Sequence, residues 1–481
     1  MRQSDLTRIR VFVYNLSYSL DDLLTCHRER SVASPQYMDF AALPGYAYAP
    51  WANDIRGGVA AEIYLHTALM QQRLGPTWAV HRTHDPDTAD LYFIPLFAAL
   101  SFTLAGNFTR GTCFSASMGR ELTHMDRMSN ARDAVSISPY FKRHPARHFV
   151  MGAAELVKTI FLFAGRPISF YLSTHDPHTA RMAAWTKSIA LVNVEALGWS
   201  VEDLFNRTVV APYSAVTSLL SGGTYERTTR QLHDEQRSGA PRKVLLYFRG
   251  SPYGPERHKL LTTLIAHLHS SSSDNHDDVV LEYNSSGAER TFQRFSARTR
   301  VSFVPQRYHD AMLRSTFCLL PPGHTCTSRR QFDAITAGCI PVRLSNYHLR
   351  RSGEPKGAPG MSCDVQGPVE VHGTPDAPTD GATAFPHILN HSSFSVHLDW
   401  ATAIKQPSTL FESLRALAAS PLELSQKRER LMEARRTITY AYESEGGGGE
   451  EGATAAGPNP FSRSGTVSGG AVRAILEELL H

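Results

Sequence analysis

Strands and helices alternate regularly between residues 243 and 344, and this pattern limits the fold more than any other feature of the sequence. Short apolar segments predict strands at Lys243–Phe248, Asp278–Tyr283, Val301–Val304, Thr316–Leu320 and Cys339–Leu344. Helices are expected between them at Glu256–His269, Tyr308–Ser315 and Ser328–Ala337. Apolar strands separated by helices are typical of a parallel sheet covered on both faces. We therefore expect a doubly wound α/β domain here.

The remaining chain adds a second domain of the same class. A strand is expected at Ile9–Tyr14 and a helix at Gly58–Arg73. Residues 221–242 are polar and read as a linker. The expected organisation is a first α/β domain over residues 1–220, the linker 221–242, a second domain over 243–440 with a surface insertion at 351–384, and a low-complexity tail over 441–481 that ends in a short helix.

Composition excludes several classes of protein. The formal net charge of +4 in 481 residues does not suit a nucleic-acid coat. No apolar run is long enough to cross a bilayer. The six cysteines show no zinc-finger spacing, and their pairing stays open. Five N-x-S/T sequons indicate a lumenal, glycosylated protein, at Asn15, Asn107, Asn206, Asn284 and Asn390.

The segment Phe317–Val342 (FCLLPPGHTCTSRRQFDAITAGCIPV) carries the clearest candidate site. Its strand ends at a Pro-Pro-Gly turn. Its helix begins at Ser328, a favourable N-cap that would form a capping box with Gln331. Ligands of doubly wound sheets bind beyond the carboxyl ends of the strands. A helix N-terminus placed there suits a phosphate or diphosphate.

Three residues of this segment fit a nucleotide ligand. Arg330 would hold the diphosphate with bidentate hydrogen bonds, and Asp333 would accept hydrogen bonds from the ribose hydroxyls. Gly323 would allow close approach of the backbone. The alternative is an ordinary capped helix on which Arg330 and Asp333 form a solvated pair.

A second strand-to-helix junction has the same properties. Arg249 lies where the strand from Lys243 ends, and Arg257 lies in the following helix. Either guanidinium could reach a phosphate beyond the strand ends. The alternative for each is a surface arginine in an arginine-rich chain.

The sequence resembles a known family. Phe317–Val342 is similar to the signature of the exostosin-like family, glycosyltransferase family 47, of plant or algal type, which reads approximately FCL-x-P-x-G-x4-S-x-R-x2-E-A-I-x2-G-C-I-P-V. Asp333 stands where the family usually has Glu, and Ala153-Ala154 replace its His-Asp pair. Other landmarks follow in family order at Val11–Leu16, Ala61–Leu69, Thr83–Pro95, Ser138–Val150, Val209–Tyr213 and Tyr308–Pro321.

The resemblance implies two Rossmann-like domains facing across a cleft, the GT-B arrangement. The C-terminal domain would bind a nucleotide sugar, normally a UDP-sugar, and the N-terminal domain an acceptor glycan or glycoprotein. By position, Ser328 and Arg330 would hold the diphosphate and Asp333 the ribose. The resemblance also implies inverting transfer in the Golgi lumen by a membrane-anchored protein, so an N-terminal anchor is expected to be missing from this chain. A homo- or heterodimer with another transferase is a further expectation.

Inverting transfer needs a base for the acceptor hydroxyl. Glu62 is the positional candidate, with Glu155 and Asp54 as weaker alternatives; the other interpretation of Glu62 is a structural carboxylate. Asp85 and Asp87 form a D-x-D sequence that could suggest Mn²⁺, but Pro86 and the family pattern favour a turn. No metal or other cofactor is expected to be required.

Three hypotheses about function follow. The first is an active inverting transferase that builds a cell-surface or cell-wall glycan. The second is a catalytically weak homologue that binds glycan or supports another transferase. The third, a cytosolic nucleotide-sugar enzyme, conflicts with the number of sequons.

Overall fold

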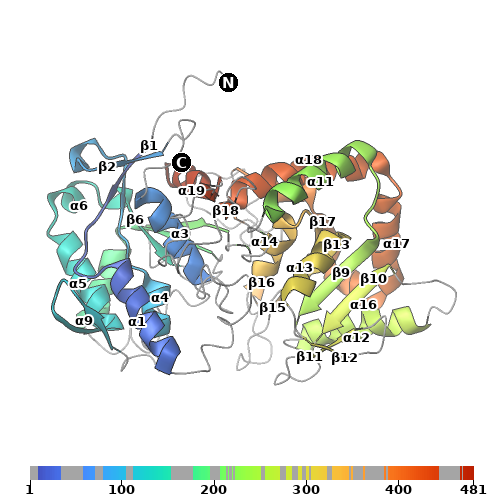
Figure 1. Ribbon diagram of the computed structural model, residues 1–481, viewed down its shortest axis with the longest axis horizontal. Coiled ribbons are helices and arrows are strands. Elements are labelled where there is room, and N and C mark those ends of the chain that lie inside the picture. The colour runs from blue at the N-terminus through green and yellow to red at the C-terminus, as the bar shows by residue number, and fades with distance from the viewer. Residues whose placement is uncertain are drawn as a thin grey trace, which may run out of the picture. The chain divides into compact units, whose positions relative to one another are not determined.

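The computed structural model forms two compact units, the first from Met1–Thr217 with Ile438–His481 and the second from Ser218–Thr437 (Figure 1). The structure describes residues 9–33, 58–70, 80–104, 112–152, 177–194, 206–212, 215, 219, 223–250, 255–270, 278–283, 291–294, 300–302, 305–321, 328–345, 348–349, 361–362, 384–385, 388–443, 466–468 and 470–480. Most of the expected insertion at 351–384 lies outside these residues. Each unit is described by itself below.

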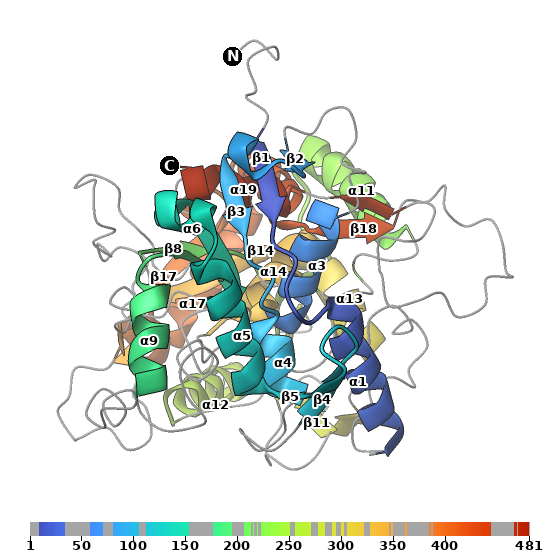
Figure 2. The same ribbon diagram turned by 90° about the vertical axis from the view of Figure 1, so that its left-hand side faces the viewer.

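The first unit is built on a six-stranded parallel sheet of order β2-β1-β3-β6-β7-β8. Its topological switch point lies between β1 and β3, because the order runs outward in opposite directions from there. Helix α3 contacts β1, β2 and β6, while α4, α5 and α9 pack together (Figure 2). The strands are β1 (Ile9–Val13), β2 (Val80–Thr83), β3 (Leu91–Phe93), β6 (His148–Gly152), β7 (Ala190–Asn193) and β8 (Arg207–Val210).

The helices of this unit begin with α1 (Leu20–Ala33), where Ser19 and Asp22 form reciprocal backbone–side-chain hydrogen bonds of 3.0 and 3.1 Å. The expected short helix near the C-terminus is confirmed as α19 (Ala471–Leu480), whose apolar face is buried and which contacts β8. The others are α3 (Gly58–Met70), α4 (Ala98–Leu104), α5 (His124–Ser136), α6 (Pro139–Arg143) and α9 (Pro177–Thr186), with the hairpin β4 (Thr112–Ser115)–β5 (Arg120–Thr123).

The second unit contains a seven-stranded sheet of order β12-β11-β10-β9-β13-β14-β17. The pairs from β10 to β17 are parallel, as the sequence predicts, whereas β11 and β12 pair antiparallel at one edge. The switch point lies between β9 and β13, because the strand order runs outward in opposite directions from this central pair. The strands are β9 (Val244–Gly250), β10 (Val279–Tyr283), β11 (Thr291–Arg294), β12 (Arg300–Ser302), β13 (Ser315–Leu320), β14 (Ile340–Ser345) and β17 (Val396–Asp399).

Helices contact both sides of this sheet system, which confirms the doubly wound α/β prediction. Helices α13 and α14 contact β9, β13 and β14, while α12, α16 and α17 form a second contacting group. The helices are α11 (Thr224–Ser238), α12 (Pro255–Ser270), α13 (Pro305–Leu313), α14 (Arg329–Thr336), α15 (His391–Phe394), α16 (Trp400–Lys405), α17 (Pro407–Ala418) and α18 (Pro421–Ile438).

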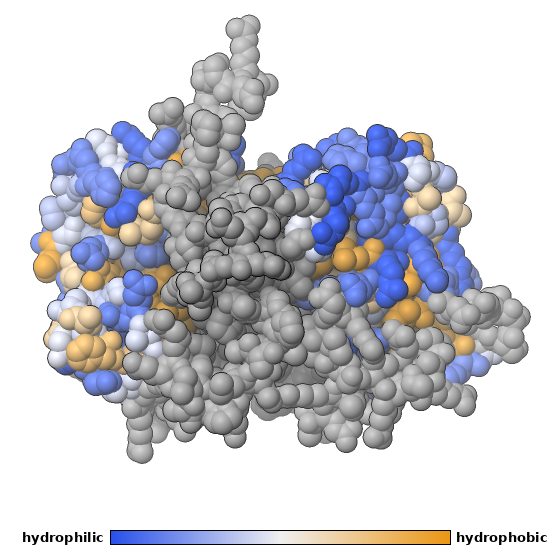
Figure 3. Space-filling model, viewed as in Figure 1, coloured by the Kyte–Doolittle hydropathy of each residue, from blue (hydrophilic) through white to orange (hydrophobic). Residues whose placement is uncertain are grey.

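The expectation of a linker at 221–242 is wrong. Residues 224–238 form α11 in the second unit, and Tyr225, Thr228 and Leu232 of this helix are buried. The Arg435 guanidinium lies 3.7 Å from the centroid of the Tyr225 ring and donates to the Tyr225 carbonyl. The polar residues that suggested a linker are the solvent face of this helix, and Figure 3 shows a mainly hydrophilic surface there. Only a narrow apolar stripe distinguishes such a helix from a loop.

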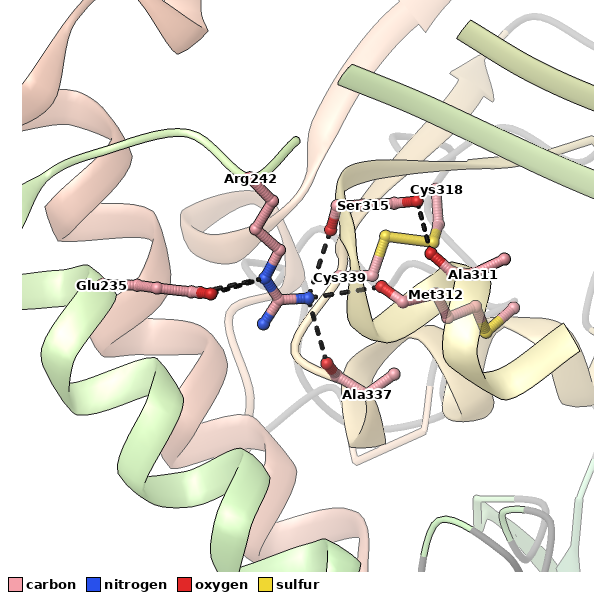
Figure 4. Close-up of a disulfide and its surroundings, with 8 residues drawn as sticks. All are labelled: Glu235, Arg242, Ala311, Met312, Ser315, Cys318, Ala337 and Cys339. Atoms are coloured by element: carbon pink, nitrogen blue, oxygen red, sulfur yellow. Dashed lines mark hydrogen bonds and ion pairs between the residues drawn. A yellow bond between two sulfur atoms is a disulfide. The ribbon is translucent and has the colours of Figure 1, made fainter. Parts of the chain in front are cut away.

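The buried guanidinium of Arg242 connects four elements of the second unit (Figure 4). Its Nε donates to both carboxylate oxygens of Glu235 at 2.9 Å. Its Nη1 donates to three backbone carbonyls, those of Met312 (3.3 Å), Ser315 (3.2 Å) and Ala337 (3.2 Å). These carbonyls lie at the end of α13, the start of β13 and the end of α14. One side chain therefore fixes the positions of α13, β13 and α14 relative to α11.

Two disulfides answer the open question of cysteine pairing among the described residues. Cys26 on α1 is bonded to Cys113 on β4. Cys318 on β13 is bonded to Cys339, the residue before β14, next to the Arg242 cluster (Figure 4). Because disulfides persist in oxidising compartments, both bonds agree with the lumenal interpretation of the sequons. Within the described ranges, no helix is both long and apolar enough to span a membrane.

We predict that Gly239→Ala destabilises the protein by about 2–3 kcal/mol. Gly239 has a φ of +63°, and an added Cβ would lie 2.6 Å from Cβ of Pro421. Gly119 has a φ of +62° with nothing within 4 Å of an added Cβ, so Gly119→Ala tests the backbone cost alone, about 1 kcal/mol. Urea unfolding measures both, and equal losses would contradict the packing argument.

We predict that stability falls as the pH is lowered from about 6.5 to about 4. Burial lowers the pKa of His148 to about 4, so the unfolded chain binds a proton in this range that the folded protein does not. His148 contributes a slope of about 1.4 kcal/mol per pH unit. Urea unfolding at several pH values should show a smaller slope for His148→Gln than for the exposed-site control His84→Gln; equal slopes would refute the assignment.

Candidate functional site

The carboxyl ends of β9 and β13 define the candidate site in the second unit. These neighbouring strands flank the switch point, where their exits diverge and leave room for a ligand. Arg249 and Gly250 end β9, and α14 begins at Arg329, shortly after β13 ends at Leu320. These strand ends and this helix start lie close to where the sequence predicts them, because they are local features.

Arg330, in the first turn of α14, lies over the end of β9. Its guanidinium carbon is 4.8 Å from the centroid of the Phe248 ring, a cation–π contact. Within the described part of the chain, its buried Nε and Nη1 have no hydrogen-bond partner. Buried donors of this kind need an acceptor. Arg330 therefore presents a cationic donor group at the switch point.

Gly250 makes this position of Arg330 sterically feasible. A Cβ at residue 250 would lie 2.2 Å from Nη2 of Arg330 and 3.1 Å from Cζ of Phe248. Any side chain here would displace the guanidinium from the ring. A role for this glycine was not predicted from the sequence, although it directly follows the predicted site residue Arg249.

Arg249 was expected to bind a phosphate, but its side chain lies against a carboxylate of the protein. Its Nη1 lies 3.4 Å from Oε2 of Glu282 on the adjacent strand β10, and each side chain is 2% exposed. The two residues are also direct partners in the parallel register. Arg249 thus forms part of a buried ion pair beneath the switch point. The role of Glu282 was not predicted from the sequence. The feature that could have indicated it is a single carboxylate in the otherwise apolar strand VVLEY.

Asp333 is buried, with 1% of its surface exposed. The Tyr308 hydroxyl donates to its Oδ2 at 3.1 Å, and Nε of Arg329 lies 3.8 Å from the same oxygen. Burial and the nearby carboxylate raise the pKa of Tyr308 well above its usual value, so the phenol stays a donor. Asp333 connects α14 to α13, and it is not a solvated partner of Arg330.

Ser328 is the N-cap residue of α14, with extended backbone angles, but its side chain makes no capping hydrogen bond. The expected capping box with Gln331 is therefore wrong. The Gln331 N–H instead donates to the Ser328 carbonyl at 3.0 Å, which tightens the first turn. The half-buried Ser328 side chain lies beside the same helix N-terminus as Arg330.

Arg257 and Gly323 are the two other residues predicted on the donor side. Arg257 is 5% exposed in the first turns of α12, so it is not a surface arginine. Gly323 lies outside the described residues, as do the alternative bases Glu155 and Asp54.

Glu62, the candidate base, is 1% exposed on α3. Its Oε1 accepts from the Ala99 N–H at 3.1 Å and its Oε2 from the Leu100 N–H at 3.4 Å. Both N–H groups belong to the first turn of α4, so the carboxylate caps that helix. This geometry favours the structural interpretation of Glu62.

The D-x-D sequence forms a local turn. Asp85 accepts a hydrogen bond from the Asp87 N–H at 3.0 Å and caps the short helix Pro86–Thr88. The Asp87 carboxylate pairs with Arg143 at 3.0 Å. Among the described residues, no group of three or more His, Cys, Asp or Glu side chains is arranged to hold a metal ion.

The fold and these contacts together define an α/β protein in which Arg330 forms a candidate anion-binding site at the switch point of a parallel sheet. The Exostosin GT47 domain matches residues 5–414, and the chain belongs to this family. This confirms the resemblance seen in the sequence.

Curated relatives share moderate identity with the chain. A probable xyloglucan galactosyltransferase, GT17 of Arabidopsis thaliana, is 26% identical over 56% of this chain and 50% of its own length. The probable arabinosyltransferase ARAD1 of the same plant is 24% identical over 70% of this chain and 62% of its own length. The chain thus spans about half to two-thirds of these relatives. Among solved structures, the lipopolysaccharide glycosyltransferase WaaG is similar, with 13% identity, a TM-score of 0.31 and coverage of 66% of this chain and 80% of WaaG.

We predict that Glu282→Gln lowers the free energy of unfolding by about 3 kcal/mol, because it leaves the Arg249 charge buried without its carboxylate. The control Glu433→Gln breaks an exposed pair with Arg430 and should cost less than about 0.5 kcal/mol. Urea unfolding of both variants provides the measurement. A loss at Glu282 as small as that at Glu433 would contradict the buried pair.

Proposed function

We propose that this protein is an inverting glycosyltransferase that moves a sugar from a UDP-sugar to a glycan or glycoprotein. The observation that carries the proposal is Arg330, whose buried Nε and Nη1 have no hydrogen-bond partner among the described residues and lie beside the N-terminus of α14 at the switch point of the second sheet. Membership of the Exostosin GT47 family and the names of its glycosyltransferase relatives support it.

In the proposed reaction, an acceptor hydroxyl displaces the nucleoside diphosphate from the anomeric carbon. Negative charge builds on the leaving diphosphate, and fixed cations and dipoles stabilise that charge most effectively when they are already in place. Phe248 and Gly250 hold Arg330 in position before the ligand binds. The Ser328 side chain and the N–H groups of α14 complete the diphosphate site.

The other predicted donor-side residues have different proposed roles. We propose that Asp333 positions Tyr308 and Arg329 rather than contacting the ribose, because it is buried against both. Arg249, paired with Glu282, contributes positive charge beneath the site, and Arg257 and Gly323 keep their expected places around the diphosphate. Glu62 stabilises α4 and is not proposed as the base.

The acceptor is proposed to be a cell-wall or cell-surface polysaccharide. The names of two relatives support this acceptor: one is called a probable xyloglucan galactosyltransferase and the other a probable arabinosyltransferase. The two disulfides and the exposed sequon residues Asn206 and Asn390 fit an oxidising, glycosylating compartment, for which we propose the Golgi lumen.

The donor site can be tested with UDP and two variants. We predict that Arg330→Ala weakens UDP binding at least about tenfold, the effect of losing a charge-assisted bidentate contact. Gly250→Ala should weaken binding similarly while leaving stability nearly unchanged, because its Cβ meets only the outer ends of the Arg330 and Phe248 side chains and no backbone atom. Isothermal titration calorimetry measures the affinity, and Arg430→Ala, which removes an exposed arginine of α18 in the same unit, is the control.

Transfer and hydrolysis with a panel of UDP-sugars then test catalysis. Turnover of one UDP-sugar, with inversion seen by NMR, is the expected result. Full UDP affinity in Arg330→Ala would refute the donor site. UDP binding without turnover of any sugar would support the catalytically weak homologue instead.

A further inference from the structure

A pocket of about 500 Å³ lies in the first unit, at the carboxyl ends of its central strands. Tyr14 and Leu16 follow β1, Arg82 is near the end of β2, and Pro95 follows β3. These strands surround the switch point between β1 and β3, the place where doubly wound sheets bind ligands. A volume of this size is within the range of small-ligand sites. The donor site described above does not include this pocket.

Arg82 supplies the pocket with a positive charge. Its Nε is buried and, within the described ranges, has no hydrogen-bond partner. The other charged lining residue, Asp21, is exposed, and no described ion pair joins it to Arg82. Burying a guanidinium donor without an acceptor is unfavourable, so a ligand that brings acceptors would be stabilised here.

The neighbouring groups complete the pocket wall. Helix α1 begins at Leu20, and both Ser19 and Leu20 line the pocket, while Asp21 and Asp22 in its first turn offset the positive end of the helix dipole. His66 also lines the pocket; burial and the Arg82 charge lower its pKa to about 4. His66 is therefore neutral at pH 7 and offers one donor and one acceptor to hydroxyl groups.

The lining also suits a sugar ring. Phe97 and Leu24 provide apolar surface, and the polar residues Tyr14 and Thr67 also line the pocket. Tyr14 is held in place because its hydroxyl contacts Nε2 of His148 at 2.8 Å and Oγ of Ser138 at 3.1 Å. Apolar walls with a few fixed polar groups are typical of small-molecule sites.

We propose that this pocket binds a carboxylate-bearing sugar unit, a hexuronic acid, with Arg82 as the ligand of its carboxylate. The inference rests on the proposed function, because it assigns the unit to the acceptor glycan. A carboxylate matches the edge of a guanidinium with two parallel hydrogen bonds. A neutral sugar would leave the Arg82 charge uncompensated. The bound hydroxyls would contact His66.

The test is a ligand-observed NMR titration of the full chain, made in an oxidising bacterial host so that disulfides form and no glycan is added at Asn15, which lines the pocket. The probes are methyl α-D-galacturonoside, methyl α-D-galactoside and sodium acetate. The uronoside should bind at least tenfold more tightly than either other probe. Arg82→Gln should abolish this preference, Arg82→Lys should reduce it, and the exposed control Arg143→Gln should preserve it.

Equal affinity for the uronoside and the galactoside, or an unchanged preference in Arg82→Gln, would overturn the proposal. Acetate that binds as tightly as the uronoside would show an anion site and overturn the sugar assignment. Thermal unfolding confirms that each variant is folded. UDP binding, measured on the same samples, separates the two proposals: UDP binding that depends on Arg330 without uronoside binding refutes only the pocket assignment.

Discussion

The buried Arg242 guanidinium determines how the second unit is assembled. It is the shared hydrogen-bond donor for Glu235 on α11 and for carbonyls at the ends of α13 and α14 and the start of β13. Arg428 of α18 also donates to the Glu235 and Ala240 carbonyls, at 2.9 and 2.7 Å. Buried networks of this kind are stable only when the partners are nearly complete. The network therefore fixes the elements whose opposite ends form the candidate site.

The switch point of the second sheet combines two kinds of arginine. Arg249 is neutralised by Glu282 within the sheet, whereas Arg330 lies against Phe248 with buried donors that have no partner among the described residues. Arg249 forms a buried ion pair, whereas Arg330 provides a group that can bind a ligand. Since both belong to rigid elements, little reorganisation is needed when an anionic ligand arrives. Fixed cations near a leaving diphosphate are what the proposed reaction requires.

The first unit uses the same topological principle with different side chains. Its switch point opens into a pocket that contains Arg82, neutral His66 and exposed Asp21. Glu62, which lies four residues before His66 in the sequence, instead accepts hydrogen bonds from the first turn of α4. The two units therefore each present an arginine at the strand ends, with Arg330 proposed for the donor and Arg82 for the acceptor.

The sequence by itself determined the α/β class, the family and the position of the segment around Ser328 and Arg330, because strand periodicity, turns and motifs are local. Only tertiary structure decided that residues 224–238 form a packed helix, that Asp333 contacts Tyr308, that Glu62 caps α4, and that Glu282 pairs with Arg249. In each case the deciding partner lies far away in the chain or on a neighbouring strand. Sequence patterns report which residues can carry charge, whereas burial and contact decide what that charge does.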